Sequence, residues 1–219
     1  PECIICDEKG MQALDAYADV IERRGIPCFL AQETVIAALS DTVTPQGVLA
    51  VMPMLAVDHE DLLEAAAGTV VVADRVRDPG NLGSMLRAAD AAGAGGLVAC
   101  SGSADLYNPK AVRSTAGSIF HLPHSVGCTM REAAQAFRRR GFTVIVADPH
   151  AGRGHWDFAW PERPALVLGN EAWGIPEEEE ELADEMVRIP ILGGAESLNV
   201  AAAAAVLLYE IERGRRNRA

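Results

Sequence analysis

The sequence predicts an α/β fold in which helices cover both faces of a mostly parallel sheet. Short apolar segments alternate with amphipathic helical segments along most of the chain, as in proteins built from strand–helix–strand units. Residues 69–73 form a continuous β-branched run, Thr-Val-Val-Val-Ala, which is typical of a strand buried on both faces. The 219 residues suffice for one large domain, or for one domain and a small module.

Residues 1–54 predict the small α/β module. We expect strands at 3–6, 27–30 and 47–52, and helices at 11–24 and 34–39. In the first helix apolar residues recur at the spacing of one helical face, and Gly25 supplies its end. Pro53 interrupts this pattern. We interpret residues 55–68, which include a helix ended by Gly68, as a linker.

Residues 69–219 predict the larger domain. After the strand at 69–73 we expect a helix at 82–92, a strand at 96–100, helices at 109–114 and 131–140, strands at 143–147, 165–168 and 186–189, and a closing helix at 198–212. The closing helix is apolar nearly all round. Such a helix is expected to be buried on all sides, either in the core or at a subunit interface.

The composition excludes several classes of protein. A net charge of −12 argues against a protein that coats nucleic acid nonspecifically, because phosphate binding needs clustered Lys and Arg. No apolar run approaches the length of a membrane span, and no secretory signal is visible, so we expect a cytoplasmic protein. The five cysteines, an odd number scattered through apolar segments, predict reduced thiols in a cytosolic protein. Cys3 and Cys6 lack the second pair of cysteines that a zinc ribbon needs. We interpret His121 and His124, in an apolar strand, as structural.

Three loops that follow predicted strands have unusual compositions, and ligands of such sheets bind at the carboxyl ends of the strands. The first is Asp-Pro-Gly-Asn-Leu-Gly at 78–83, where we expect Asn81 to cap the next helix. Arg87 lies off the buried stripe of that helix and can point toward the loop. The alternative is an exposed Arg87 paired with Asp90 at i+3.

The second loop is Gly-Asn-Glu-Ala-Trp-Gly at 169–174, in which Gly169 allows close approach of a ligand to the backbone. An ordinary turn with Trp173 as packing is the alternative. The third loop spans 189–199 and ends in a Ser-Leu-Asn helix start. None of the three is a nucleotide-binding, Walker, serine-hydrolase or zinc-protease signature, which disfavours those chemistries.

Taken together and in this order, the three loops resemble the signature motifs of the SpoU family of RNA ribose methyltransferases, within the SPOUT superfamily. The first motif runs from Asp78 to Asp90, the second comprises Leu168 to Glu171 with Gly174, and the third runs from Ile189 to Val200 with residues 208–210. The resemblance covers residues 69–212. Residues 1–54 are similar, more weakly, to the ribosomal-protein-like RNA-binding module often fused ahead of this domain. The stretch 191–194 departs from a more usual Met-containing sequence.

The resemblance implies a SPOUT fold with a deep C-terminal trefoil knot, a homodimer with its site at or near the interface, and S-adenosylmethionine as cofactor. It implies catalytic or active-site roles for five polar residues: Asn81, Arg87, Glu171, Ser197 and Asn199. It implies cofactor binding by Leu168, Gly169, Asn170, Gly174, Ile189, Ile191, Ser197 and Leu198. No metal is expected, because a sulfonium is already a strong electrophile.

The implied reaction is methylation of a ribose 2′-hydroxyl in structured RNA, with 23S-type ribosomal RNA as the expected partner. Arg87 would hold the target phosphate and stabilise negative charge on the oxygen. We expect basic side chains to gather near the site, from among Arg75, Arg77, Lys110 and Arg113, with solvated surface as the alternative. The alternative functions are transfer RNA methylation, a catalytically idle knotted RNA-binding protein, and a nucleotide-binding enzyme of ordinary doubly wound fold.

Overall fold

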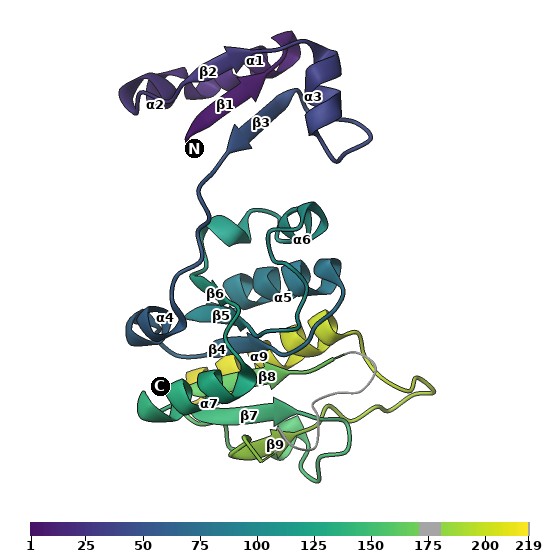
Figure 1. Ribbon diagram of the computed structural model, residues 1–219. Coiled ribbons are helices and arrows are strands. Elements are labelled where there is room, and N and C mark those ends of the chain that lie inside the picture. Colours follow the sequence, from purple (N-terminus) through teal and green to yellow (C-terminus); the bar gives the residue numbers. More distant parts are fainter. Residues whose placement is uncertain (171–180, 219) are drawn as a thin grey trace. The chain divides into compact units, whose positions relative to one another are not determined.

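The computed structural model describes residues 1–170 and 181–218, and it contains two compact units, Pro1–Met54 and Leu55–Ala219 (Figure 1). Predicted residues Glu171, Trp173 and Gly174 lie outside the described residues. Within the described ranges, no helix is long and apolar enough to cross a membrane. All five cysteines are free thiols, with Cys6, Cys100 and Cys128 buried.

The first unit is a three-stranded sheet with short helices. Its elements are β1 (Cys3–Cys6), α1 (Glu8–Leu14), a 3-10 turn (Asp15–Tyr17), α2 (Ala18–Arg23), β2 (Cys28–Leu30), α3 (Glu33–Leu39) and β3 (Val48–Val51). The order is β2-β1-β3, with β2 parallel and β3 antiparallel to β1. The predicted single helix at 11–24 is wrong. Asp7 caps an earlier start by accepting a hydrogen bond from Gly10 N–H (2.7 Å), and a 3-10 turn interrupts the helix.

The second unit is a six-stranded, wholly parallel sheet in the order β6-β5-β4-β8-β7-β9. The strands are β4 (Val70–Ala73), β5 (Gly96–Ala99), β6 (His124–Val126), β7 (Thr143–Ala147), β8 (Pro164–Leu168) and β9 (Glu185–Val187). The helices are α4 (His59–Ala65), α5 (Pro79–Ala91), α6 (Pro109–Ser114), α7 (Met130–Arg139) and α9 (Val200–Arg216), with 3-10 turns at Ser118–Phe120 and His155–Asp157. Parallel strands joined through helices confirm the predicted fold class.

Strand β4 shows why the sheet is buried on both faces. All four of its residues are inaccessible to solvent. Val70 and Val72 belong to a core cluster with α4 and α7, whereas Val71 and Ala73 belong to a cluster with α5 and α9. Successive side chains of a strand point to opposite faces, so the β-branched run contributes to both clusters. Residues 55–68 are part of this unit, because Leu62 of α4 lies in the first cluster.

Helix α9 differs from its prediction on one face. Its buried residues pack beside α5, but Val206 and Tyr209 are 40% and 56% exposed. The helix is therefore not buried on all sides within one chain. Of the two alternatives, complete burial in the core is wrong. The knot implied by the family resemblance stays a prediction.

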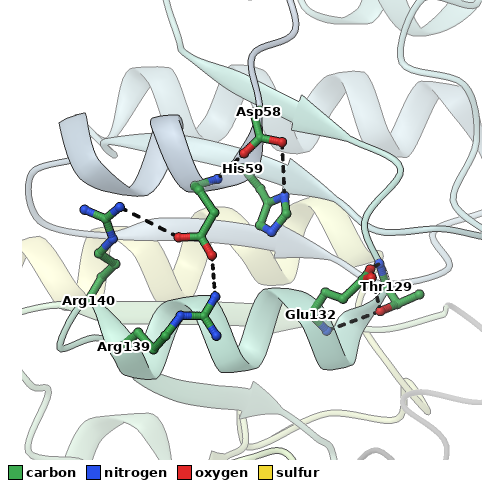
Figure 2. Close-up of polar contacts among 7 residues, drawn as sticks. Asp58, His59, Thr129, Glu132, Arg139 and Arg140 are labelled. Atoms are coloured by element: carbon green, nitrogen blue, oxygen red, sulfur yellow. Dashed lines mark hydrogen bonds and ion pairs between the residues drawn. The ribbon is translucent and has the colours of Figure 1, made fainter.

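The three consecutive arginines at the end of α7 are each paired with a carboxylate. Arg138 Nη2 lies 2.8 Å from Asp184 Oδ1. Arg139 forms an ion pair with Glu60 of α4, and Arg140 Nη2 lies 3.8 Å from the same carboxylate. Figure 2 shows Arg139 and Arg140 extending from α7 toward α4. The two contacts with Glu60 join α4 to the end of α7, and each of the three arginines lies beside a carboxylate.

Helix α7 begins with a capping box, also drawn in Figure 2. Thr129 Oγ1 accepts a hydrogen bond from Glu132 N–H (3.2 Å), and Glu132 Oε2 accepts one from Thr129 N–H (2.8 Å). The backbone hydrogen bond from Thr129, followed by the bond from its hydroxyl, holds the pKa of the Glu132 carboxyl below its usual value. The cap fixes the N-terminus of α7, the helix whose other end carries the arginines.

Candidate functional site

A cavity of about 560 Å³ lies at the carboxyl ends of β7, β8 and β9. Its volume is in the range of small-molecule sites. Seven of the residues expected to bind the cofactor line it: Leu168, Gly169, Asn170, Ile189, Ile191, Ser197 and Leu198. The structure therefore brings the second and third loops together, although some 20 residues separate them in the sequence. Gly174 lies outside the described residues.

The second loop is tied to the end of the neighbouring strand β4. Leu168 C=O accepts a hydrogen bond from Asp74 N–H (2.9 Å), and Asn170 Nδ2 donates one to Arg75 C=O (3.0 Å). Arg75 has a φ of 53°, which is uncommon for a residue other than glycine. Its guanidinium lies 3.2 Å from the buried carboxylate of Asp74. The unusual backbone conformation of Arg75 is thus held by the hydrogen bond to its carbonyl and by the ion pair of its side chain.

The first and third loops meet through a pair of asparagines. Asn199 Oδ1 accepts hydrogen bonds from Ala201 N–H (2.9 Å) and Ala202 N–H (3.2 Å), so this residue caps α9. Asn199 Nδ2 donates to Asn81 Oδ1 (2.8 Å) across 118 positions of sequence. One side chain thus starts a helix and joins two of the loops singled out by their sequence.

The N-cap of α5 is Asp78, not Asn81 as the sequence suggested. Asp78 Oδ1 accepts a hydrogen bond from Asn81 N–H (2.9 Å), and Pro79 occupies the first helical turn. The hydrogen bond from Lys110 Nζ (2.5 Å), and next the one from Asn81 N–H, hold the pKa of the Asp78 carboxyl below its usual value. Because Asp78 takes the capping role, the Asn81 side chain is released to meet Asn199.

Arg87 is exposed on α5 and is not among the residues that line the cavity. The alternative pairing with Asp90 is wrong, because the Asp90 carboxylate lies 3.5 Å from His121 Nδ1. Within residues 1–170 and 181–218, no ion pair to Arg87 is found. The guanidinium is therefore available to a ligand that approaches α5 from solvent.

The four basic residues expected near the site have different surroundings. Lys110 is paired with Asp78, and Arg75 with Asp74. Arg77 and Arg113 are exposed. Lys110 and Arg113 belong to α6, which packs closely on α5 at Gly83: a Cβ atom there would overlap the carbonyl oxygen of Ala111. Glycine at this position lets α6 approach the helix that carries Arg87.

Sequence reasoning missed one wall of the cavity. Three of its lining residues follow β7: Asp148, Pro149 and His150. The cavity is also lined by Ala147, Val187, Glu196, Val200 and Ala203. Asp148 Oδ1 accepts a hydrogen bond from His150 N–H (2.5 Å), which fixes the carboxylate in the loop. The position of this loop at the carboxyl end of a predicted parallel strand could have indicated that it lines a ligand site. Its amino-acid composition is not unusual.

Comparison with known proteins gives a consistent match. The model of the SpoU rRNA Methylase family matches residues 68–209. The 23S rRNA (guanosine(2553)-2′-O)-methyltransferase RlmP of Bacillus subtilis is 38% identical over 187 residues, covering 85% of this chain and 73% of that protein.

Several solved structures match nearly the whole chain. The SpoU methyltransferase AviRb from Streptomyces viridochromogenes has a TM-score of 0.85 at 32% identity, covering 99% of this chain and 83% of that one. The AdoMet-bound rRNA methyltransferase from Sinorhizobium meliloti has a TM-score of 0.85 at 30% identity, covering 97% and 79%. The resemblance read from the three loops is confirmed: this chain belongs to the SpoU rRNA methylase family.

Proposed function

We propose that this chain transfers a methyl group from S-adenosylmethionine to a ribose 2′-hydroxyl of ribosomal RNA. The observation that carries the proposal is the convergence of three loops distant in sequence. Two of them enclose the cavity, and the third is joined to them by the Asn199–Asn81 hydrogen bond. The relatives named above act on 23S rRNA or are described as rRNA methyltransferases, which supports the same substrate class here.

The residues of the cavity suit S-adenosylmethionine. Leu168, Ile189 and Leu198 offer apolar surface to an adenine ring, and backbone groups beside Gly169 can pair with its edge. The carboxylates of the lining suit a ligand that carries an ammonium and a sulfonium charge. When bound, the cofactor supplies an electrophilic methyl group. The protein's part is to hold that group in line with the ribose oxygen.

Arg87 would bind a phosphate of the substrate and stabilise the negative charge that develops on the 2′-oxygen. A guanidinium does not serve as the base, because it keeps its proton in proteins. Water or a substrate phosphate would accept the hydroxyl proton. Asn81 and Asn199 would orient the ribose, with Ser197 and Glu171 as further active-site groups.

The assembly we propose is a homodimer in the cytoplasm. The exposed apolar side chains of α9, Val206 and Tyr209, would be covered by the second copy. Residues 1–54 would serve as the module that recognises the RNA. This unit has three basic and eight acidic residues, a net charge of −5, so it would read RNA by shape rather than by general attraction to phosphate.

The test uses Arg87→Ala with Arg131→Ala, another exposed arginine, as control. Each protein receives ribosomal RNA from a strain that lacks this enzyme, and the 2′-O-methyl marks are mapped. We expect Arg87→Ala to lose about 10²–10³-fold in turnover, with an unchanged calorimetric Kd for S-adenosylmethionine. Arg131→Ala should retain both properties.

Each alternative has its own outcome. Absence of cofactor binding by the wild-type protein would favour the idle RNA-binding protein. Marks placed on transfer RNA alone would favour the transfer RNA enzyme. Near wild-type turnover of Arg87→Ala would remove the role assigned to this arginine.

A further inference from the structure

The hydroxyl of Tyr107 makes three hydrogen bonds in the second unit. It accepts from Leu55 N–H (2.9 Å) and from Ala56 N–H (2.6 Å), and its oxygen lies 2.9 Å from His124 Nε2. The next amide, Val57 N–H, donates to His124 C=O (2.9 Å). Three consecutive backbone amides at the start of the unit are therefore bound by two residues, Tyr107 and His124.

Counting protons fixes the direction of each bond. A tyrosine hydroxyl has one hydrogen and two lone pairs, and the two amides occupy both lone pairs. Its hydrogen must therefore point to His124 Nε2, which accepts it. His124 Nδ1 then carries the ring proton and donates it to Leu122 C=O (3.1 Å). The imidazole is 1% exposed, so the network holds a neutral histidine with every polar atom satisfied.

The network binds the residues that directly follow the N-terminal unit in the chain. Only Met52, Pro53 and Met54 separate the last residue of β3 from the first bound amide, and three residues span at most about 10 Å. On its other side, Tyr107 immediately precedes Asn108, the N-cap of α6. Helix α6 packs on α5, which carries the proposed phosphate-binding arginine.

We propose that Tyr107 and His124 are positioning residues for the RNA substrate. They fix residues 55–57, so that the N-terminal unit is attached by a short tether to a defined point on the catalytic unit. This inference rests on the proposed function, in which residues 1–54 contact the RNA. Loss of the anchor would let that unit sample more positions, and the RNA would bind less tightly. The cofactor cavity, formed by other loops, would be unchanged.

The first test is spectroscopic and uses the wild-type chain. The amides of residues 55–57 should exchange with solvent slowly, in contrast to Met54, and the ¹⁵N shifts of His124 should report a protonated Nδ1 and a bare Nε2. In Tyr107→Phe, exchange at Leu55 and Ala56 should rise at least about tenfold. Tyr17→Phe removes one hydroxyl from a residue that is 61% exposed, and it should leave exchange at these amides unaltered. Fast exchange in the wild type would overturn the anchor.

The second test separates positioning from general stability. With a ribosomal RNA substrate, Tyr107→Phe should raise KM about three- to tenfold, with kcat and the Kd for S-adenosylmethionine within twofold of wild type. An unchanged KM, despite faster exchange, would refute a role in substrate binding. If kcat, the affinity for S-adenosylmethionine and the melting temperature all fell in Tyr107→Phe, the role of Tyr107 would be merely structural. Wild-type protein that methylates no RNA would contradict the proposed function, and the exchange data would still decide on the anchor.

Discussion

Gly83 lies in the interior of α5 where α6 packs against it, and Gly83→Ala tests how tightly these helices must pack. An added Cβ would overlap the carbonyl oxygen of Ala111, and it would lie 2.8 Å from Ser114 Cβ and 3.0 Å from the Ala111 carbonyl carbon. Two of these obstacles are backbone atoms, which move only if α6 moves. Gly214 in α9 is the matched control, because a Cβ there would make an ordinary contact with Trp160 Cδ1 at 3.8 Å.

The two substitutions should change stability in opposite directions. Replacing glycine by alanine in a helix interior gains up to about 1 kcal/mol through helix propensity, somewhat less near a helix end. Gly214→Ala should realise most of that gain. At Gly83 the overlap should cost about 3 kcal/mol, the upper end of the usual range, because the obstacle is backbone. The net loss is then about 2 kcal/mol, or about 4–8 °C in the melting temperature of a unit of this size.

Urea denaturation of the two variants and the wild type measures both effects. Gly83→Ala should lower the urea concentration at the midpoint and Gly214→Ala should raise it. The dependence of the free energy of unfolding on urea concentration should be the same in all three proteins. RNA turnover should fall in Gly83→Ala, because α6 is displaced from α5, while the Kd for S-adenosylmethionine stays constant. Equal stabilisation by both substitutions would refute the argument that glycine at position 83 is required for the close packing of α5 and α6.

Three further predictions concern single side chains. Asn199→Ser keeps a helix cap but is too short to reach Asn81, so it should lose turnover with little change in stability. Asn199→Ala should also lower the free energy of unfolding by about 1 kcal/mol, because it removes the cap. Equal stability of the two variants would argue against the cap. The hydrogen bond from Lys110 lowers the pKa of the Asp78 carboxyl, so the ionised Asp78 should contribute its full stability at pH values above its ordinary pKa of 3.8 and lose this contribution as the pH falls further. The melting temperature of Asp78→Asn should therefore depend less on acid pH than that of the wild type. An identical dependence would contradict the role assigned to Asp78. Asp148→Asn should weaken calorimetric binding of S-adenosylmethionine more than that of the product S-adenosylhomocysteine, which lacks the sulfonium charge. Equal weakening of both would place the carboxylate away from the sulfonium.

Much of the fold could be predicted because its signals are local. The β-branched run at 69–73 indicated burial on both faces, and the two core clusters confirm it. The N-cap of α5 was also determined by residues next to it in the sequence. Pro79 favours the first turn of a helix, which points to Asp78 as the cap, and this preference should have outweighed the general preference for asparagine at Asn81.

Other features depend on the order of the strands, which periodicity does not reveal. The pairing of Arg139 with Glu60 joins residues 79 positions apart, so the sequence does not show that this charge is balanced. The same holds for Asp148, whose loop joins the cavity only because β7 lies beside β8. His124 was correctly interpreted as structural, but its partner Tyr107 has no sequence signature.

The central position of β4 has a consequence for biosynthesis. Its neighbours are β5, which follows within 30 residues, and β8, which begins about 90 residues later. At translation rates of roughly 5–20 residues per second, one edge of this wholly apolar strand stays unpaired for about 5–20 s after it leaves the ribosome. An unpaired apolar edge is a template for association with other chains. We therefore expect slow codons between β4 and β8, which lengthen this interval, to lower the yield of soluble protein.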